Sequence, residues 1–335
     1  MGKRIGRQTL QFTEEITIRS FATVAGRKEA EGPLGHLYDY VFPDNLFGED
    51  SWEKAEQKLQ QYAVELALEK VNLNAGQLDY YLGGDLLNQI IATSYTARKI
   101  GVPFFGLYGA CSSLVEAMIL GSCLIDGGFA DLLVTCASSH HETAERQLRY
   151  PTEMGVQRTL TSQWTVTGSG AYILGKHTGE WKITHAIPGK IIDREIKNNA
   201  DMGSAMAAAA ADTIITFAED TDLLMGIDYI VTGDLGIVGY KLCQQLLKEK
   251  GIDLGEKYTD CGLAVYHAEQ QDVHAGGSGC GCSAIVLGTR YLAQRLRQKG
   301  SKLLLVGTGA LLSPTTNLQG DSIPGIGHGI LIEKI

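Results

Sequence analysis

The sequence lacks features that would assign it to several broad classes of protein. It has no uninterrupted apolar run near the roughly 20 residues that a membrane-spanning helix needs. Its formal net charge is −9 and no Lys/Arg-rich stripe is present, so a nucleic-acid-binding surface is not expected. The N-terminal segment is basic but continues into polar residues, so we expect no signal peptide. A soluble chain is the expectation.

The seven cysteines include no C-x-x-C pair. An odd number without such pairs is typical of a reducing compartment rather than of a disulfide framework. His274, Cys280 and Cys282 lie close together, but their spacing among glycines does not match a structural zinc pattern. We therefore expect no metal site. With 335 residues, 44% of them hydrophobic, the chain can form two core-bearing halves or one large α/β domain.

One cysteine, Cys111, lies in an unusual context. An apolar, strand-like segment (102–105) precedes it, and an almost wholly apolar segment (112–125) follows it and ends at Gly127-Gly128. This pattern predicts a buried strand, a tight turn and a buried helix. At a helix N-terminus the free N–H groups and the helix dipole favour a thiolate, which suits a nucleophile or an anion site. The alternative is a cysteine that only packs in the core.

The flanking segments alternate between strand and helix patterns. Strands are predicted at 16–24, 78–83 and 131–137, with helices at 50–68 and 88–99 between them. Asp50 and Glu53 have the spacing of a capping box at the start of the first helix. This alternation predicts an α/β fold with a mostly parallel sheet that helices cover on both faces.

A long polar segment, 138–165, interrupts this pattern. Long loops in compact domains are usually binding loops or lids. His140 and His141 follow the carboxyl end of a predicted strand, where open α/β sheets bind ligands. Arginine is the usual bidentate partner of a carboxylate, and this segment contains Arg149 and Arg158. The alternative is a solvated loop with incidental charges.

The second half of the sequence repeats the first. Three pairs of segments align: 78–86 with 227–235, 111–114 with 282–285, and 131–134 with 302–305. The third pair continues the alignment of the second pair without a gap. An internal duplication of a β-α-β-α-β unit accounts for this. We expect two halves, residues 1–180 and 181–335.

A duplicated α/β unit with a cysteine opening the first buried helix, and a glycine-rich loop at the matching place in the second half, resembles the thiolase fold. More narrowly, the chain is similar to the 3-oxoacyl-carrier-protein synthase III branch. The resemblance implies a homodimer of subunits with five layers, α-β-α-β-α, in which the cysteine carries an acyl group.

Two motifs of that branch are missing. Gly233-Asp234-Leu235-Gly236 stands where a H-Q-A-N motif is expected, and Ser278 falls where an N-T-S motif opens. Decarboxylative condensation needs the histidine and asparagine of these motifs as donors. We therefore expect no catalytic residues, and a binding protein with a degenerate pocket in which Cys111 is retained. The alternatives are an active cysteine-dependent acyltransferase or 3-oxoacyl synthase, and a purely structural scaffold.

Five segments narrow the resemblance to the stage V sporulation protein AD family of spore-forming bacteria: residues 3–9, 109–113, 138–142, 274–284 and 307–315. This resemblance implies binding of dipicolinic acid, alone or as its calcium chelate, with no other cofactor. It also implies membrane proteins of the same sporulation operon as partners, peripheral association with the spore inner membrane, and a role in uptake of the compound and its release in germination.

A flat dianion needs donors for two carboxylates and a slot for its ring. A helix N-terminus can bind one carboxylate without a charged side chain. We expect the ligand-binding residues to come from the Cys111 turn, the glycine-rich loop and the long polar segment: Ala110, Cys111, Ser112, Gly277, Ser278, His140, His141, Arg149 and Arg158.

Overall fold

A computed structural model describes residues 2–149 and 158–335. Its main element is one mixed β-sheet with the strand order β11-β10-β13-β14-β9-β2-β8-β6-β4-β5. The strands of the first half are β5 (Phe104–Gly106), β4 (Tyr80–Gly84), β6 (Leu132–Ser139), β8 (Gly168–Lys176) and β2 (Thr9–Ala25). Those of the second half are β11 (Tyr258–Asp260), β10 (Tyr229–Thr232), β13 (Lys302–Ala310), β14 (Gly325–Lys334) and β9 (Trp181–Ile187).

The sheet has the same connectivity when it is followed inward from either edge. In the first half β5, β4 and β6 are parallel and β8 and β2 are antiparallel additions. In the second half β11, β10 and β13 are parallel, followed by antiparallel β14 and β9. Antiparallel pairing of β2 with β9 joins the halves. The predicted mostly parallel sheet is therefore wrong, because β8 and β14 return antiparallel to β6 and β13 and the central strands continue that pairing. The predicted duplication is confirmed, whereas the division into two domains at residue 180 stays a prediction.

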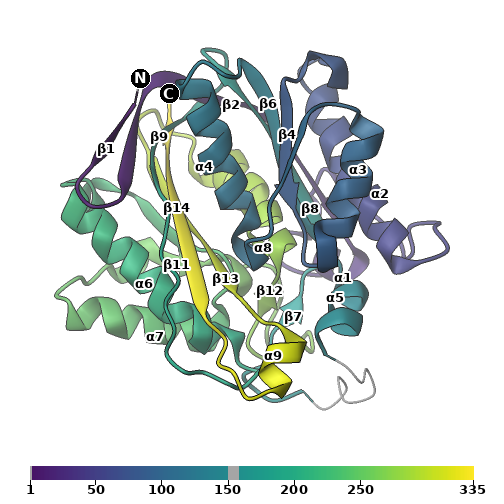
Figure 1. The fold of residues 1–335 in the computed structure, drawn as a ribbon, viewed down its shortest axis with the longest axis vertical. Helices are drawn as coiled ribbons and strands as arrows, with labels where there is room; N and C mark the ends of the chain where they lie inside the picture. The colour runs from purple at the N-terminus through teal and green to yellow at the C-terminus, as the bar shows by residue number, and fades with distance from the viewer. Residues whose placement is uncertain (1, 150–157) are drawn as a thin grey trace.

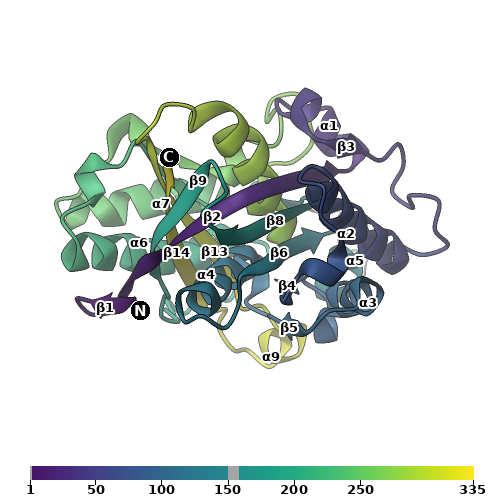
Figure 2. The ribbon, with the colours of Figure 1, turned by 90° about the horizontal axis from the view of Figure 1, so that it is seen from above.

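Helices form three layers around the two halves of the sheet (Figures 1 and 2). The outer face of the first half is covered by α2 (Trp52–Glu69) and α3 (Ile91–Ile100). The outer face of the second half is covered by α6 (Met202–Asp220) and α7 (Gly236–Glu249). Between the halves lie α4 (Ser113–Asp126) and α8 (Cys280–Val286), which a π-helical segment, Leu287–Arg295, continues. This is the predicted five-layered arrangement.

The central helices are buried because both of their faces meet a sheet. Leu114 and Met118 of α4 are fully buried, as are Cys282 and Ile285 of α8. Fully burying a large apolar side chain contributes about 1.5–3 kcal/mol, so this layer accounts for much of the fold's stability. The apolar run after Cys111 therefore has the role that the sequence predicts.

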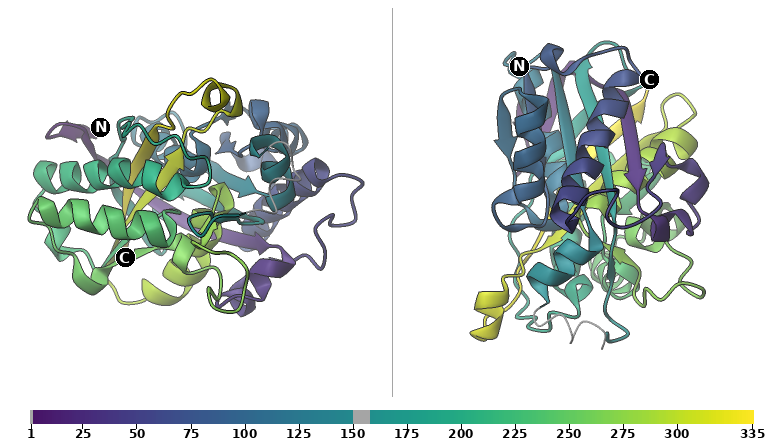
Figure 3. Two further views of the ribbon diagram at one scale, coloured as in Figure 1. Left: turned by 90° about the horizontal axis from the view of Figure 1, so that it is seen from below. Right: turned by 90° about the vertical axis from the view of Figure 1, so that its right-hand side faces the viewer.

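Shorter elements complete the fold, and the yellow helix α9 projects at one end of the molecule (Figure 3). They are β1 (Lys3–Ile5), β3 (Tyr40–Val41), β7 (Trp164–Thr165), β12 (Gly277–Ser278), α1 (Arg27–Ala30), α5 (His141–Leu148) and α9 (Pro314–Leu318). Within 2–149 and 158–335, no helix is both long enough and apolar enough to cross a membrane.

Two local predictions are wrong. The helix cap of α2 is Ser51, whose hydroxyl accepts the N–H of Lys54, while Asp50 forms an ion pair with Lys54 at 2.7 Å. The polar segment 138–165 is not one loop, because β6 extends to Ser139, α5 follows, and β7 pairs with β12. Short-range polarity obscured these elements, which are held by contacts with distant parts of the chain. Residues 150–157 of that segment lie outside the described residues.

Candidate functional site

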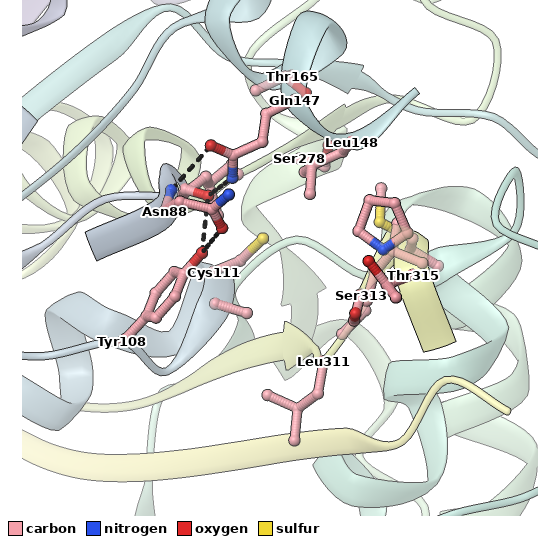
Figure 4. A pocket seen from close by; sticks show the side chains of 17 residues that line it. Asn88, Tyr108, Cys111, Gln147, Leu148, Thr165, Ser278, Leu311, Ser313 and Thr315 are labelled. Atoms are coloured by element: carbon pink, nitrogen blue, oxygen red, sulfur yellow. Dashed lines mark hydrogen bonds between the residues drawn. The ribbon is translucent and has the colours of Figure 1, made fainter. Parts of the chain in front are cut away.

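A cavity of about 500 Å³ opens beside Cys111 (Figure 4). Its walls come from the turn before α4, the end of α5, the paired strands β7 and β12, and the segment between β13 and α9. The described lining residues are Leu86, Asn88, Tyr108, Ala110, Cys111, Gln147, Leu148, Thr165, Met202, Ser278, Gly279, Ala310, Leu311, Leu312, Ser313, Pro314 and Thr315. Amides, hydroxyls and a thiol supply its polar groups, and none of these lining side chains is charged.

Cys111 lies in a 3₁₀ turn, Ala110–Ser112, directly before α4. Ala110 has a φ of 50°, a left-handed conformation that costs an L-residue about 1–2 kcal/mol. The pKa of the Cys111 thiol is raised well above its usual value. Burial is the largest cause, and the carboxylate of Asp234 is the next. The helix dipole contributes only about 0.3–1 kcal/mol, which does not offset these effects. Burial and Asp234 therefore oppose the expected thiolate and favour the neutral thiol at Cys111.

Asp234 is the buried carboxylate beneath this thiol. It follows β10 at the carboxyl end of the strand and is 1% exposed. One carboxylate oxygen accepts the hydroxyl of Thr308 at 2.7 Å, and the other accepts the N–H of Gly279 at 2.9 Å. The thiol of Cys111 lies close enough to this carboxylate for the two groups to affect each other's pKa. Burial raises the pKa of Asp234 to about 6.

The sequence alone did not single out Asp234, because it was considered only as part of a replaced motif. A signal was present: an acidic residue follows a buried strand at the carboxyl edge of the sheet, where α/β folds place functional groups. Its contact with Cys111, 123 positions earlier in the numbering, depends on how the two halves pack. Such contacts leave no local pattern.

The two positions where the synthase motifs are missing offer little chemistry. A side chain at Gly233 would place its Cβ 3.0 Å from the backbone nitrogen and the hydroxyl oxygen of Thr308, so a histidine does not fit there without movement. Ser278 is 1% exposed and contributes one hydroxyl to the cavity wall. Among the described lining residues there is no imidazole that could act as a base for Cys111.

Three of the predicted ligand-binding residues line the cavity: Ala110, Cys111 and Ser278. Two others lie beside it without lining it. The hydroxyl of Ser112 donates to the carbonyl of Gly109 at 2.6 Å, and the carbonyl of Gly277 accepts the side-chain amide of Gln163 at 2.8 Å.

The two histidines also lie outside the described lining of the cavity. The ring of His140 is fully buried, with Nε2 2.8 Å from the carbonyl of Asn45 and Nδ1 3.1 Å from the carboxylate of Glu142. Burial opposes protonation of this ring, but its neighbour Glu142 outweighs burial and the pKa of His140 is raised. His141 stacks on Trp164 with ring centroids 3.6 Å apart, and burial lowers its pKa to about 3. Neither ring reaches over Cys111.

Both arginines are held in ion pairs away from the cavity. Arg149, the residue after the end of α5, pairs with Glu145 of that helix at 2.7 Å. Arg158 pairs with Asp272 and lies over the ring of Trp164, 4.9 Å from its centroid. Neither guanidinium lines the cavity in the described part of the chain. Across that part, no three His, Cys, Asp or Glu side chains are placed to hold a metal ion.

Comparison with known proteins gives the family. The sequence model of stage V sporulation protein AD matches residues 6–333. The chain is also 45% identical over 333 residues to stage V sporulation protein AD of Bacillus subtilis, covering 99% of this chain and 98% of that protein. This chain belongs to the stage V sporulation protein AD family.

Solved structures similar to this family member are condensing enzymes of the thiolase fold. A variant of OleA from Xanthomonas campestris has a TM-score of 0.63 at 14% identity, covering 96% of this chain and 99% of that one. The 3-oxoacyl-(acyl carrier protein) synthase III of Xanthomonas oryzae has a TM-score of 0.61 at 14% identity, covering 97% and 100%. At such identities the likeness establishes the fold alone.

Proposed function

We propose that this protein binds dipicolinic acid in the Cys111 cavity and catalyses no reaction there. The observation that carries the proposal is a retained cavity whose cysteine is a buried thiol beside Asp234, with Gly233 and Ser278 where a condensing enzyme needs an imidazole and an amide. In this function the protein serves uptake of dipicolinate into spores and its release in germination. It acts as a homodimer at the spore inner membrane, with membrane proteins of the same operon.

The lining of the cavity suits a flat dicarboxylate. Neutral donors, among them the side chains of Asn88, Ser278 and Thr315, come from different walls (Figure 4), and leucines also line the cavity. Hydrogen bonds from neutral donors contribute about 0.5–1.5 kcal/mol each, so several must act together. Because the described lining has no cation, we expect the calcium chelate, which carries its own positive charge, to bind at least as tightly as free dipicolinate.

Lack of catalysis follows from the same groups. The thiolate is the nucleophilic form of cysteine, and burial with Asp234 disfavours it at Cys111. Loss of one oxyanion-stabilising donor commonly costs about 10²–10³-fold in rate. With the histidine and asparagine positions both altered, we expect no measurable condensation.

Blocking the cavity from its rim tests the proposal. Thr315 lines the cavity at the start of α9, whereas Thr316, the next residue, does not. Calorimetric titration with dipicolinate, with and without calcium, is expected to give saturable binding in the wild type and in Thr316→Trp. Thr315→Trp is expected to weaken binding by about tenfold or more, about 1.4 kcal/mol.

Three results would overturn this proposal. The first is binding that is equal in the two tryptophan variants, which would place the ligand elsewhere. The second is turnover of an acyl thioester through an acylated Cys111, which would restore the enzymatic alternative. The third is absence of any heat with dipicolinate in the wild type.

A further inference from the structure

A second recess, of about 390 Å³, lies next to the Cys111 cavity. Partly exposed Arg146 and Glu53 line it together with buried Thr143. It shares two lining residues with the Cys111 cavity, Asn88 and Gln147. These two side chains therefore form a wall that separates the two spaces.

One side chain holds this wall in place. The amide of Gln147, on α5, accepts the backbone N–H of Asn88 at 2.8 Å and donates to the carbonyl of Leu86 at 2.9 Å. Tyr108 adds only long contacts, 3.5 Å to the carbonyl of Leu86 and 3.4 Å to the side chain of Asn88 (Figure 4). Loss of the Gln147 side chain therefore removes both short hydrogen bonds to the wall.

The segment behind the wall is strained and is fixed at both ends. Gln89 and Ile90 have φ values of 60° and 44°, and a left-handed conformation is an outlier for a β-branched residue. Buried Asp85 accepts the N–H of Leu87 at 2.8 Å and the N–H of Thr93 at 2.7 Å. Strain of this kind persists only where surrounding contacts impose it, and it gathers at ligand clamps and switches. The Gln147 amide supplies that constraint on the side of Leu86 and Asn88.

The recess also contains a cation, which the described lining of the Cys111 cavity lacks. The guanidinium of Arg146 pairs with Glu53, and its side chain is 50% exposed. It lies over the ring of Trp52, 5.3 Å from the centroid. A half-exposed ion pair contributes little to stability, so an incoming carboxylate can exchange with Glu53 at little cost.

We propose that the Arg146 recess is a side entrance to the Cys111 cavity for a small carboxylate ligand, and that Gln147 is the residue that closes it. Arg146 attracts the anion to the outer mouth, and release of the Leu86–Asn88 wall by Gln147 joins the two spaces. The ligand class rests on the proposed function, whereas the passage itself rests on the geometry.

Stopped-flow kinetics with dipicolinate test the entrance. Arg146→Ala is expected to slow association about threefold or more and to flatten its dependence on salt, because a steering charge acts on the encounter rate. Gln147→Ala is expected to speed association and dissociation together and to change the Kd less than either rate. The matched controls are Arg98→Ala and Gln245→Ala, exposed residues on α3 and α7. Unchanged rates in both test variants would overturn the proposal.

A second measurement needs no dipicolinate binding. Cys111 and half-buried Cys123, at the far end of α4, are alkylated with anionic iodoacetate or neutral iodoacetamide at pH 9, and each site is quantified by peptide mass spectrometry. Arg146→Ala is expected to lower the iodoacetate-to-iodoacetamide ratio at Cys111 but not at Cys123, and Gln147→Ala to raise both rates at Cys111. If dipicolinate fails to bind but these changes occur, only the ligand assignment fails. If the ratio is unaffected, the entrance is wrong.

Discussion

Glu56→Gln tests the buried polar layer that supports α5. Glu56, on α2, is fully buried; its two oxygens accept the hydroxyls of Ser138 at 3.1 Å and Thr143 at 2.7 Å. Burial, and then the neighbouring carboxyl of Asp85, raise its pKa from 4.5 to about 8. The hydroxyl of Thr143 also reaches the carbonyl of His140 at 3.0 Å. A glutamine can therefore replace the carboxyl, donating to Thr143 while that hydroxyl donates to His140.

The sign of the effect follows from proton binding. Because the pKa is higher in the folded state, the folded protein keeps a proton that the unfolded chain releases between pH 4.5 and 8. Stability therefore falls as the pH rises through this window. At 1.36 kcal/mol per pH unit the loss between pH 5 and pH 9 is about 4 kcal/mol. Glu56→Gln removes this loss. The unfolding free energy of Glu56→Gln minus that of the wild type should therefore be about 4 kcal/mol larger at pH 9 than at pH 5.

Urea denaturation of the wild type and Glu56→Gln at the two pH values measures this difference. Glu65→Gln is the matched control, since Glu65 is an exposed carboxyl on the same helix. It should change stability by less than about 0.5 kcal/mol at either pH. A Glu56→Gln effect that is the same at pH 5 and pH 9, or a variant less stable at pH 9, would refute the reasoning.

Two further predictions concern the thiol and the sheet edge. Burial is the largest cause of the raised pKa of Cys111, and the carboxylate of Asp234 is the next, so Asp234→Asn should lower that pKa. Iodoacetamide should then alkylate Cys111 faster at pH 7.5 and Cys123 at an unchanged rate. Equal rates at Cys111 in the wild type and the variant would exclude this role for Asp234. Phe105 is 47% exposed on β5, which pairs with β4 alone among the described strands, so Phe105→Asp should dissociate the proposed homodimer in sedimentation experiments. Phe129→Asp, which changes another exposed phenylalanine, should leave the dimer intact. Dissociation by Phe129→Asp but not by Phe105→Asp would place the interface elsewhere.

Local pattern and repetition predicted the central helix and the correspondence of the two halves, but not the antiparallel strands of the sheet, and the five layers were implied by the family resemblance. The apolar run after Cys111 predicted α4, and the alignment of 131–134 with 302–305 matched β6 to β13. These predictions succeeded because burial on both faces leaves a continuous apolar signature in the sequence. The duplication then fixed which strands and helices correspond.

The site was harder to predict because it is built from long-range contacts. His140 follows a strand end as expected, but Asn45 and Glu142 engage its ring, and the first of these is 95 residues away. Arg158 has its partner, Asp272, 114 residues further along the chain. Nothing in the sequence marks Gln147, since its contact with Asn88 joins residues that are 59 positions apart. Residue type alone does not distinguish a side chain that lines the cavity from one that forms an ion pair elsewhere on the protein.

Protection of Cys111 from alkylation tests the central claim most directly. Iodoacetamide modification of Cys111 and Cys123 is followed by mass spectrometry at increasing dipicolinate, with and without calcium. The account predicts that the ligand slows modification of Cys111 in a saturable way and leaves Cys123 unchanged, because only Cys111 lines the cavity. Equal modification of Cys111 at saturating dipicolinate would contradict binding in this cavity.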